Sequence, residues 1–255
     1  MIRAGDASGL AAHGSGSKDR AGLDAAGLVF TGEMYGVQLD QLAQVLGVSQ
    51  RSAIATVSRW VADGLAESAR LGPGPRWIWL TKAGLTRCGL PYTAAVPALS
   101  RLAHLRAVTA TRIALAATPH FTDGQAYWRS ERRLRSKFGR RMGLREHLPD
   151  AEVHWPDGTP LAWAGECWAI EAELTPKTIS RTAEIMREAL ARTGDYGCSP
   201  ADVIQPGQPA RHARVIYLCS PAARLVVGRS RDTLGALAGR VELRLLPADA
   251  QWQQE

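Results

Sequence analysis

The chain has 255 residues, 45% of them hydrophobic and 22% charged, which is typical of a globular protein with one large domain or two smaller ones. Its formal net charge of +7 favours a polyanionic partner. No apolar run approaches the ~20 residues that a membrane-spanning helix needs, and the N-terminus lacks the apolar core of a signal peptide. The sequence therefore predicts no membrane partner and a cytoplasmic, nucleoid-associated location.

The four cysteines lie far apart in the sequence and lack the close Cys or His pairs of a zinc site. We expect reduced thiols, as is usual in cytoplasmic proteins. They are Cys88, Cys167, Cys198 and Cys219.

Three segments interrupt the regular patterns of the chain. Residues 1–26 are rich in Gly, Ala, Ser and Asp and hold few large apolar side chains, so we predict a disordered N-terminal segment. Gly and Pro cluster between Gly89 and Pro97, and a loop rich in Pro and Gly is expected from Tyr196 to His212. We therefore place one domain at residues 28–95 and a second at residues 98–250.

The first domain begins with two predicted helices. The first covers Val37–Leu46, Gly47 suits the turn that follows, and Ser49 is a natural N-cap for the second helix, Gln50–Asp63. We expect the second helix to bury Ala53, Ile54, Val57, Trp60 and Val61. We expect it to expose Gln50, Arg51, Ser52, Thr56 and Arg59.

Two short strands are predicted within Leu65–Leu80, around a Gly-Pro-Gly-Pro turn flanked by Arg70 and Arg76. A further helix begins after Thr81. This order of elements resembles a winged helix-turn-helix, which implies that the second helix enters a DNA major groove and that the two arginines contact phosphates or the minor groove. A winged helix used only for protein contacts is the alternative.

The second domain is predicted to begin with a helix at Leu99–Ala117 and a very basic helical stretch at Gln125–Arg145. The density of one charge favours phosphate contact over a merely solvated face. The basic residues proposed for this contact are Arg132, Arg133, Arg135, Lys137, Arg140 and Arg141. Glu131 is the one acidic residue among them.

A strand is expected to start at Pro149–Val153, and a second strand to run through Trp168–Leu174 after a turn at Pro156–Thr159. Alternation places Glu171 and Glu173 on one face, where they repel each other unless a cation or a shared proton relieves them. Thr175 and Pro176 suit the start of a helix that reaches about Thr193. Further strands are expected at Val215–Cys219 and Val241–Leu246.

These residues resemble the core of the PD-(D/E)xK nuclease superfamily, which has a helix bearing a Glu, a hairpin, and a central strand bearing an acid and a lysine. The resemblance implies that Asp150 with Glu171 or Glu173 holds Mg²⁺ or Mn²⁺. It also implies that Lys177 orients or helps to deprotonate the attacking water and that Glu131 aids metal binding. Glu173 occupies the place where the superfamily usually has its lysine, so Lys177 would substitute from the helix start. A structural trio of salt-bridged residues is the alternative.

The predicted fold class is therefore α+β or α/β: a winged helix-turn-helix followed by a mixed-sheet domain like that of restriction endonucleases. Over about Val29–Leu246 the chain resembles the replication-relaxation family of actinobacterial plasmids and integrative elements. The residues that carry this resemblance are Gln41–Ala43, Trp60–Leu65, Trp79–Gly84, Glu131, Pro149–Asp150 and Glu171–Lys177.

Three functions follow as hypotheses. The first is a Mg²⁺-dependent endonuclease or nickase directed to an origin-like site on double-stranded DNA. The second is a non-catalytic DNA-binding accessory factor or transcriptional regulator with a degenerate nuclease-like domain. The third, a relaxase that nicks through a tyrosine, is disfavoured because the six histidines are scattered singly. A homodimer and the replication or conjugation proteins of the same element are the expected protein partners.

Overall fold

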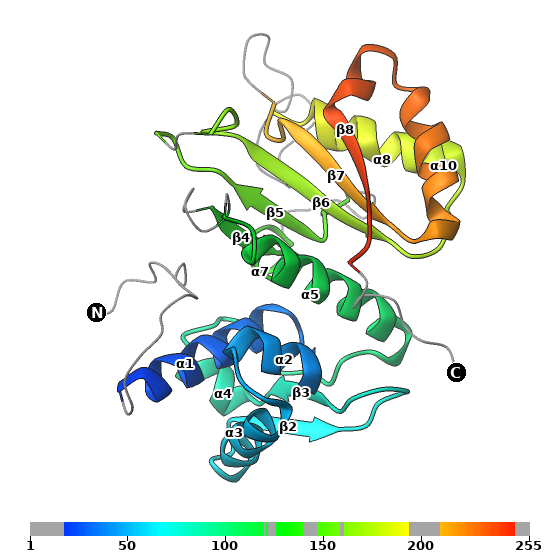
Figure 1. The fold of residues 1–255 in the computed structure, drawn as a ribbon. Coiled ribbons are helices and arrows are strands. Elements are labelled where there is room, and N and C mark those ends of the chain that lie inside the picture. Colours follow the sequence, from blue (N-terminus) through cyan, green and yellow to red (C-terminus); the bar gives the residue numbers. More distant parts are fainter. Residues whose placement is uncertain are drawn as a thin grey trace. The chain divides into compact units, whose positions relative to one another are not determined.

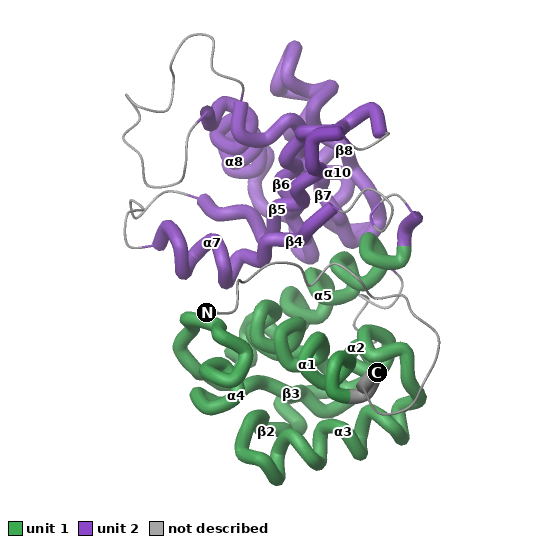
Figure 2. The backbone as a smooth tube through the Cα atoms, turned by 90° about the vertical axis from the view of Figure 1, so that its left-hand side faces the viewer, with its two compact units in different colours: residues 1–117, 252–255 green, residues 118–251 purple. Residues whose placement is uncertain are grey.

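The computed structural model describes residues 18–119, 121, 126–139, 147–158, 161–193 and 210–247. The chain forms two compact units, residues 1–117 with 252–255 and residues 118–251 (Figure 2). Both units mix helices and strands, as the sequence predicted. None of the helices in the described part of the chain combines the length and the apolar character that crossing a bilayer requires.

The first unit combines helices with a small antiparallel sheet of strand order β1-β3-β2 (Figure 1). Its helices are α1 (Lys18–Glu33), α2 (Leu39–Leu46), α3 (Gln50–Ala62), α4 (Lys82–Arg87), η1 (Leu99–Arg101) and α5 (Leu102–Ala116). Its strands are β1 (Val37–Gln38), β2 (Ala66–Ala69) and β3 (Trp77–Leu80).

Helix α1 corrects the prediction that residues 1–26 are disordered, because it begins at Lys18. Gly27, the residue that follows the predicted segment, packs closely against the next helix. A Cβ atom on Gly27 would lie 2.8 Å from the Leu46 side chain. Farther out on α1, Asp24 forms an ion pair with Arg59 of α3 at 2.9 Å. Residues 1–17 lie outside the described residues.

The predicted cap of α3 is confirmed, since the Ser49 hydroxyl accepts a hydrogen bond from the Ser52 amide at 3.2 Å. The predicted faces of the helix are partly wrong. Ile54 and Val61 are 52% and 44% exposed, whereas Thr56 is buried. The buried positions 53, 56, 57 and 60 follow the i, i+3, i+4, i+7 spacing of one helix face, and Ile54 and Val61 fall outside that stripe.

Helix α5 belongs to the first unit, although the sequence placed it at the start of the second domain. Leu102 and Leu105 pack with Trp77 and Trp79 of β3. Farther along α5, the Arg106 guanidinium forms an ion pair with Asp40 at 2.7 Å. The apolar stripe predicted a helix correctly, but no local pattern specified which unit it would pack on.

The second unit is built on a five-stranded mixed sheet of order β4-β5-β6-β7-β8. The pairs β4–β5 and β5–β6 are antiparallel, and β6–β7 and β7–β8 are parallel. The strands are β4 (Tyr127–Ser130), β5 (Ala151–His154), β6 (Cys167–Glu173), β7 (Arg214–Cys219) and β8 (Val241–Leu245). The described helices are α7 (Glu131–Phe138), α8 (Ile179–Ala191), α10 (Pro221–Asp232) and η2 (Gly235–Arg240).

Helices α8 and α10 lie against one face of this sheet (Figure 1). The core there joins Met186 and Leu190 of α8 and Val227 of α10 to Val215 and Tyr217 of β7. The opposite face of β6 carries Trp168, whose ring lies 5.0 Å from that of Trp155 between centroids. Trp155, Trp163 and Trp168 therefore pack against one another.

Two predicted elements of this unit need correction, and one helix was missed. The basic stretch from Gln125 was expected to be one helix, but it opens with β4, and α7 begins only at Glu131. Helix α8 begins at Ile179, because the Thr178 hydroxyl rather than that of Thr175 accepts from a first-turn amide, that of Arg181 at 3.3 Å. Helix α10 was not predicted at all.

Candidate functional site

Three acidic residues predicted to act together lie at one end of β5 and β6. The antiparallel register pairs Ala151 with Ile170, so its continuation places Asp150 opposite Glu171. Asp150 Oδ2 accepts a hydrogen bond from the Ala172 amide at 2.8 Å, which fixes its carboxylate beside the strand. Glu173 lies two residues beyond Glu171 and therefore on the same face. We call Asp150, Glu171 and Glu173 the acidic cluster.

Glu171 is buried, with 7% of its surface exposed, and its Oε1 lies 2.6 Å from Nε2 of His147. Burial raises the pKa of Glu171 above its usual range, and Asp150 acts in the same direction, while His147 and Lys177 oppose them. The negative charge of Glu171 raises the pKa of His147 to about 9, against the effect of burial. The imidazole of His147 is therefore protonated at neutral pH.

His147 was not predicted as a site residue. It lies three residues before Asp150, outside any strand or helix, so no periodic pattern marked it. Its backbone amide donates to Glu188 of α8 at 3.4 Å. The loop position of His147 is therefore anchored from both the sheet and the helix.

Lys177 forms an ion pair with Glu173, as its predicted position beside the strand end required. The Glu173 side chain is 8% exposed and that of Lys177 is 45% exposed, so the ammonium group lies at the surface end of the cluster. The Lys177 charge also lowers the pKa of Glu171.

Tyr217 of β7 lies next to the acidic cluster, opposite Glu171 in the parallel register. Burial raises the pKa of Tyr217 well above its usual value, and all three carboxylates of the cluster add to the effect. Its phenol is therefore protonated. Tyr217 is therefore a buried, uncharged neighbour of the acidic cluster.

Glu131 lies near Asp150 through its backbone, whose amide donates to the Asp150 carbonyl at 2.9 Å. Its side chain forms an ion pair with Arg135, one turn along α7, at 2.6 Å. The predicted role of Glu131 in metal binding stays a prediction.

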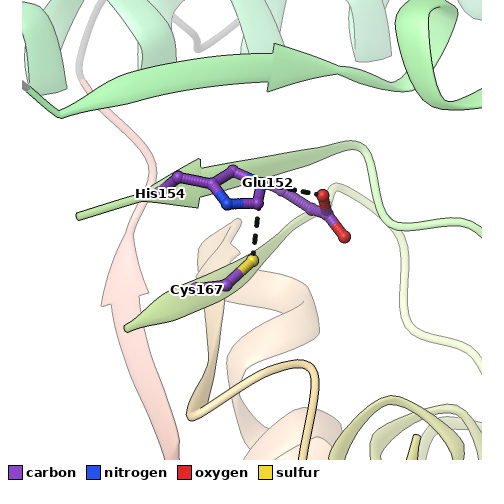
Figure 3. A group of neighbouring side chains, drawn as sticks. All are labelled: Glu152, His154 and Cys167. Carbon is purple, nitrogen blue, oxygen red and sulfur yellow. Dashed lines mark hydrogen bonds and ion pairs between the residues drawn. The ribbon is translucent and has the colours of Figure 1, made fainter. Parts of the chain in front are cut away.

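A second group of charged side chains lies on the same sheet face, around Glu152 of β5. Figure 3 shows Glu152, His154 and Cys167, whose ligand atoms all lie within 4.8 Å of one another. His154 Nε2 is 3.0 Å from Glu152 Oε2 and 3.6 Å from the Cys167 sulfur. These residue types in this arrangement could hold a metal ion of the zinc type.

The remaining partners of Glu152 disfavour a cation there. Arg211 donates to both of its carboxylate oxygens, at 2.7 and 3.1 Å, and Arg129 donates to Oε2 at 3.1 Å. His212 Nε2 lies 3.0 Å from Oε1. A metal ion would add charge beside two guanidinium groups that already share one carboxylate. We call Glu152 with these arginines and histidines the closed cluster.

The pKa values of the closed cluster agree with this assignment. Burial alone would raise the pKa of Glu152, but hydrogen bonds from His154, His212 and Arg211 hold it far below its usual range. Burial and the Glu152 charge raise the pKa of Cys167, so its thiol is protonated beside Glu152. The Glu152 carboxylate is thus fully ionised and internally neutralised.

The basic side chains predicted to contact DNA differ in exposure. Arg132 of α7 is buried, at 7% exposure, and so is not displayed as predicted. Arg133, Arg135 and Lys137 of the same helix are exposed. Arg140 and Arg141 lie outside the described residues.

In the first unit, Gln50, Arg51 and Ser52 are exposed at the start of α3, as predicted. Arg59 is exposed but forms an ion pair with Asp24, and Thr56 is buried. On the hairpin β2–β3, exposed Arg70 and Arg76 flank the turn, and Arg76 donates to the Ser68 carbonyl at 2.8 Å.

Comparisons of the chain with protein families, with curated proteins and with solved structures find no match.

Proposed function

We propose that this chain is a DNA-binding protein of a plasmid or mobile element and a Mg²⁺-dependent endonuclease or nickase that acts in replication or transfer. The observation that carries the proposal is the acidic cluster: Asp150 and Glu171 face each other across two strands. Glu173 and Lys177 complete the group at the same end of β6.

The order of elements around the cluster supports a PD-(D/E)xK core. Helix α7 bears Glu131, the antiparallel pair β5–β6 forms the hairpin, and β6 is the central strand of the five. The acids sit where β6 and β7, which run parallel, both end. Crevices at the carboxyl ends of such strands are the usual ligand sites of open sheets with parallel strands.

The donor set fits Mg²⁺ or Mn²⁺, since three carboxylates supply the hard oxygen ligands that these ions prefer. Glu171 and Glu173 would exchange their pairs with His147 and Lys177 for the ion. Asp150, Glu171 and Glu173 would hold the ion. When bound, the ion lowers the pKa of a coordinated water and stabilises charge on the scissile phosphate.

Lys177 acts at the exposed end of this group. Its ammonium donates to Glu173, and its exposure leaves room for a phosphodiester beside it. We assign it the role of orienting the attacking water, which the resemblance gives to the lysine that Glu173 replaces in the strand.

DNA binding by the first unit is supported by the sequence of elements α2, a turn at Gly47 with φ 62°, and α3, followed by a basic hairpin. This order of elements resembles that of a winged helix-turn-helix. The exposed start of α3 and the hairpin arginines supply polar and cationic groups for base edges and phosphates.

A non-catalytic DNA-binding accessory factor is the second candidate. It is favoured by the protein partners that Glu171 and Glu173 already have, His147 and Lys177. In that case the charged residues of the acidic cluster stabilise the unit and bind no ion.

The test is incubation of the full chain with supercoiled plasmid in Mg²⁺, in Mn²⁺ and in EDTA. Wild type should relax or linearise the plasmid only with metal, and Asp150→Asn and Glu171→Gln should abolish this. Glu184→Gln is the matched control, since Glu184 is 64% exposed on α8 and pairs with Arg181. A wild type that binds the plasmid but leaves it supercoiled under every metal condition contradicts the catalytic proposal and favours the accessory factor.

A further inference from the structure

Two large apolar side chains are exposed on α3, where the sequence led us to expect only polar ones. Ile54 is 52% exposed and Val61 is 44% exposed. They are seven residues apart, so they lie two turns apart on one side of the helix. Inward packing accounts for neither of them, because the buried stripe of α3 runs through Ala53, Thr56, Val57 and Trp60.

The middle of the exposed face carries two small side chains and one arginine. At about 100° per residue, Arg51, Ala55 and Ser58 lie opposite the buried stripe. All three are exposed. Ala55 and Ser58 add little width to the helix, so it can approach a surface closely, with Ile54 and Val61 along one flank and Arg51 near its N-terminus.

This combination suits one kind of surface in particular. A major groove is about 12 Å wide and takes a helix, and the apolar group it presents on base edges is the C5-methyl of thymine. Arg51 on the helix and Arg70 on the hairpin β2–β3 are both exposed, and their charge complements a phosphate backbone.

We propose that Ile54 and Val61 read thymine methyl groups, so that the recognised duplex carries thymines at two positions about three base-pair steps apart. The spacing follows from seven residues at 1.5 Å, about 10 Å, against a base-pair rise of about 3.4 Å. The inference rests on the proposed DNA binding by α3 and names the class of site that it selects.

The test begins with selection of duplexes from a randomised pool by the full chain. Each thymine of the selected duplex is then replaced singly by deoxyuridine, which removes only the methyl group. Wild type should lose about fourfold in affinity at each read position, the value for burying one methyl. For Ile54→Ser, replacing thymine by deoxyuridine should leave the affinity unchanged at one of these positions. For Val61→Ser, it should leave the affinity unchanged at the other position. Val96→Ser is the matched control, since Val96 is 54% exposed but lies outside α3.

The outcomes separate this inference from the proposed function. Equal binding of thymine and deoxyuridine duplexes by wild type overturns the inference and leaves DNA binding intact. If no duplex is retained from the pool, the proposed DNA binding fails, and the inference fails with it. A third outcome also overturns the inference. If sedimentation shows that Ile54→Ser turns a dimer into a monomer, and this variant loses affinity equally for the thymine and deoxyuridine duplexes, the flank is a self-association surface.

Discussion

Glu152 and Glu171 lie on the same face of the neighbouring strands β5 and β6, and both are buried, at 0% and 7% exposure. Their partners differ. Two arginines and two histidines surround Glu152. The Glu171 side chain pairs with His147, whose own side chain is 27% exposed. The pKa of the first carboxyl is far below its usual range and that of the second is raised.

This difference shows that burial alone does not identify a functional carboxylate. A guanidinium stays protonated at every accessible pH and cannot give up its charge. An imidazolium can lose its proton, and an exposed lysine can move aside at little cost. The closed cluster is therefore suited to holding β4 and β5 to the segment around Arg211. The acidic cluster is suited to exchanging its protein partners for an ion or a substrate.

Removal of the Glu152 charge should have the largest effect on stability. Glu152→Gln removes the carboxylate that the largely buried Arg129 and Arg211 share, which costs about 3–5 kcal/mol in the free energy of unfolding. Glu171→Gln, which leaves one partly exposed imidazole that can deprotonate, should cost clearly less. Urea denaturation followed by tryptophan fluorescence measures both.

Glu184→Gln, an exposed position on α8, is the control for the amide substitution. Equal losses for Glu152→Gln and Glu171→Gln would contradict the contrast between the clusters. So would stabilisation of wild type by Zn²⁺ that disappears in Cys167→Ala, because the closed cluster would then be a metal site.

The two clusters should also respond to pH with opposite signs. The pKa of His147 is raised from 6.5 to about 9 in the folded protein, so its contribution is complete below pH 6.5 and is lost as the pH rises through 9. The loss is at most about 3 kcal/mol. Burial lowers the pKa of His154, so the stability linked to its neutral form is lost as the pH falls below 6.5.

Denaturation between pH 5 and 10 in EDTA checks this prediction. His147→Gln should remove the decline on the alkaline side, and His154→Gln should remove part of the decline on the acid side. A wild type whose alkaline decline is unchanged by His147→Gln would show that the Glu171 pair contributes nothing to the pH dependence.

Local patterns in the sequence predicted the two glutamates of the acidic cluster and the lysine beside them. The alternation of Trp168–Leu174 placed Glu171 and Glu173 on one face, and the structure confirms the strand and its face. The position of Lys177 followed from its distance along the chain beyond Glu173. These inferences need only neighbours in sequence, which share the geometry of one strand.

The closed cluster could not be predicted in this way. Arg129, Glu152 and Arg211 come from two strands and from the segment before β7, and strand register brings them together. No local spacing encodes that register. The error in the predicted faces of α3 has a different cause. Ile54 and Val61 are apolar, so the sequence assigned them to the core, but it is Thr56 that lies on the buried stripe of the helix. Helix α10 did carry a local signal, the Ser220 cap followed by Pro221.

The smallest effect on stability is expected at Lys177, where function and stability should separate most clearly. Lys177→Met removes an ion pair whose lysine is 45% exposed, and such pairs contribute under about 1 kcal/mol. If Lys177 orients the attacking water, the same substitution abolishes metal-dependent relaxation of supercoiled plasmid. Lys82→Met, at an exposed position of α4, is the matched control and should leave both unfolding and relaxation unchanged.

Retention of relaxation by Lys177→Met would remove the lysine from the mechanism. A loss of several kcal/mol would instead make the Glu173 pair a structural one, like the closed cluster.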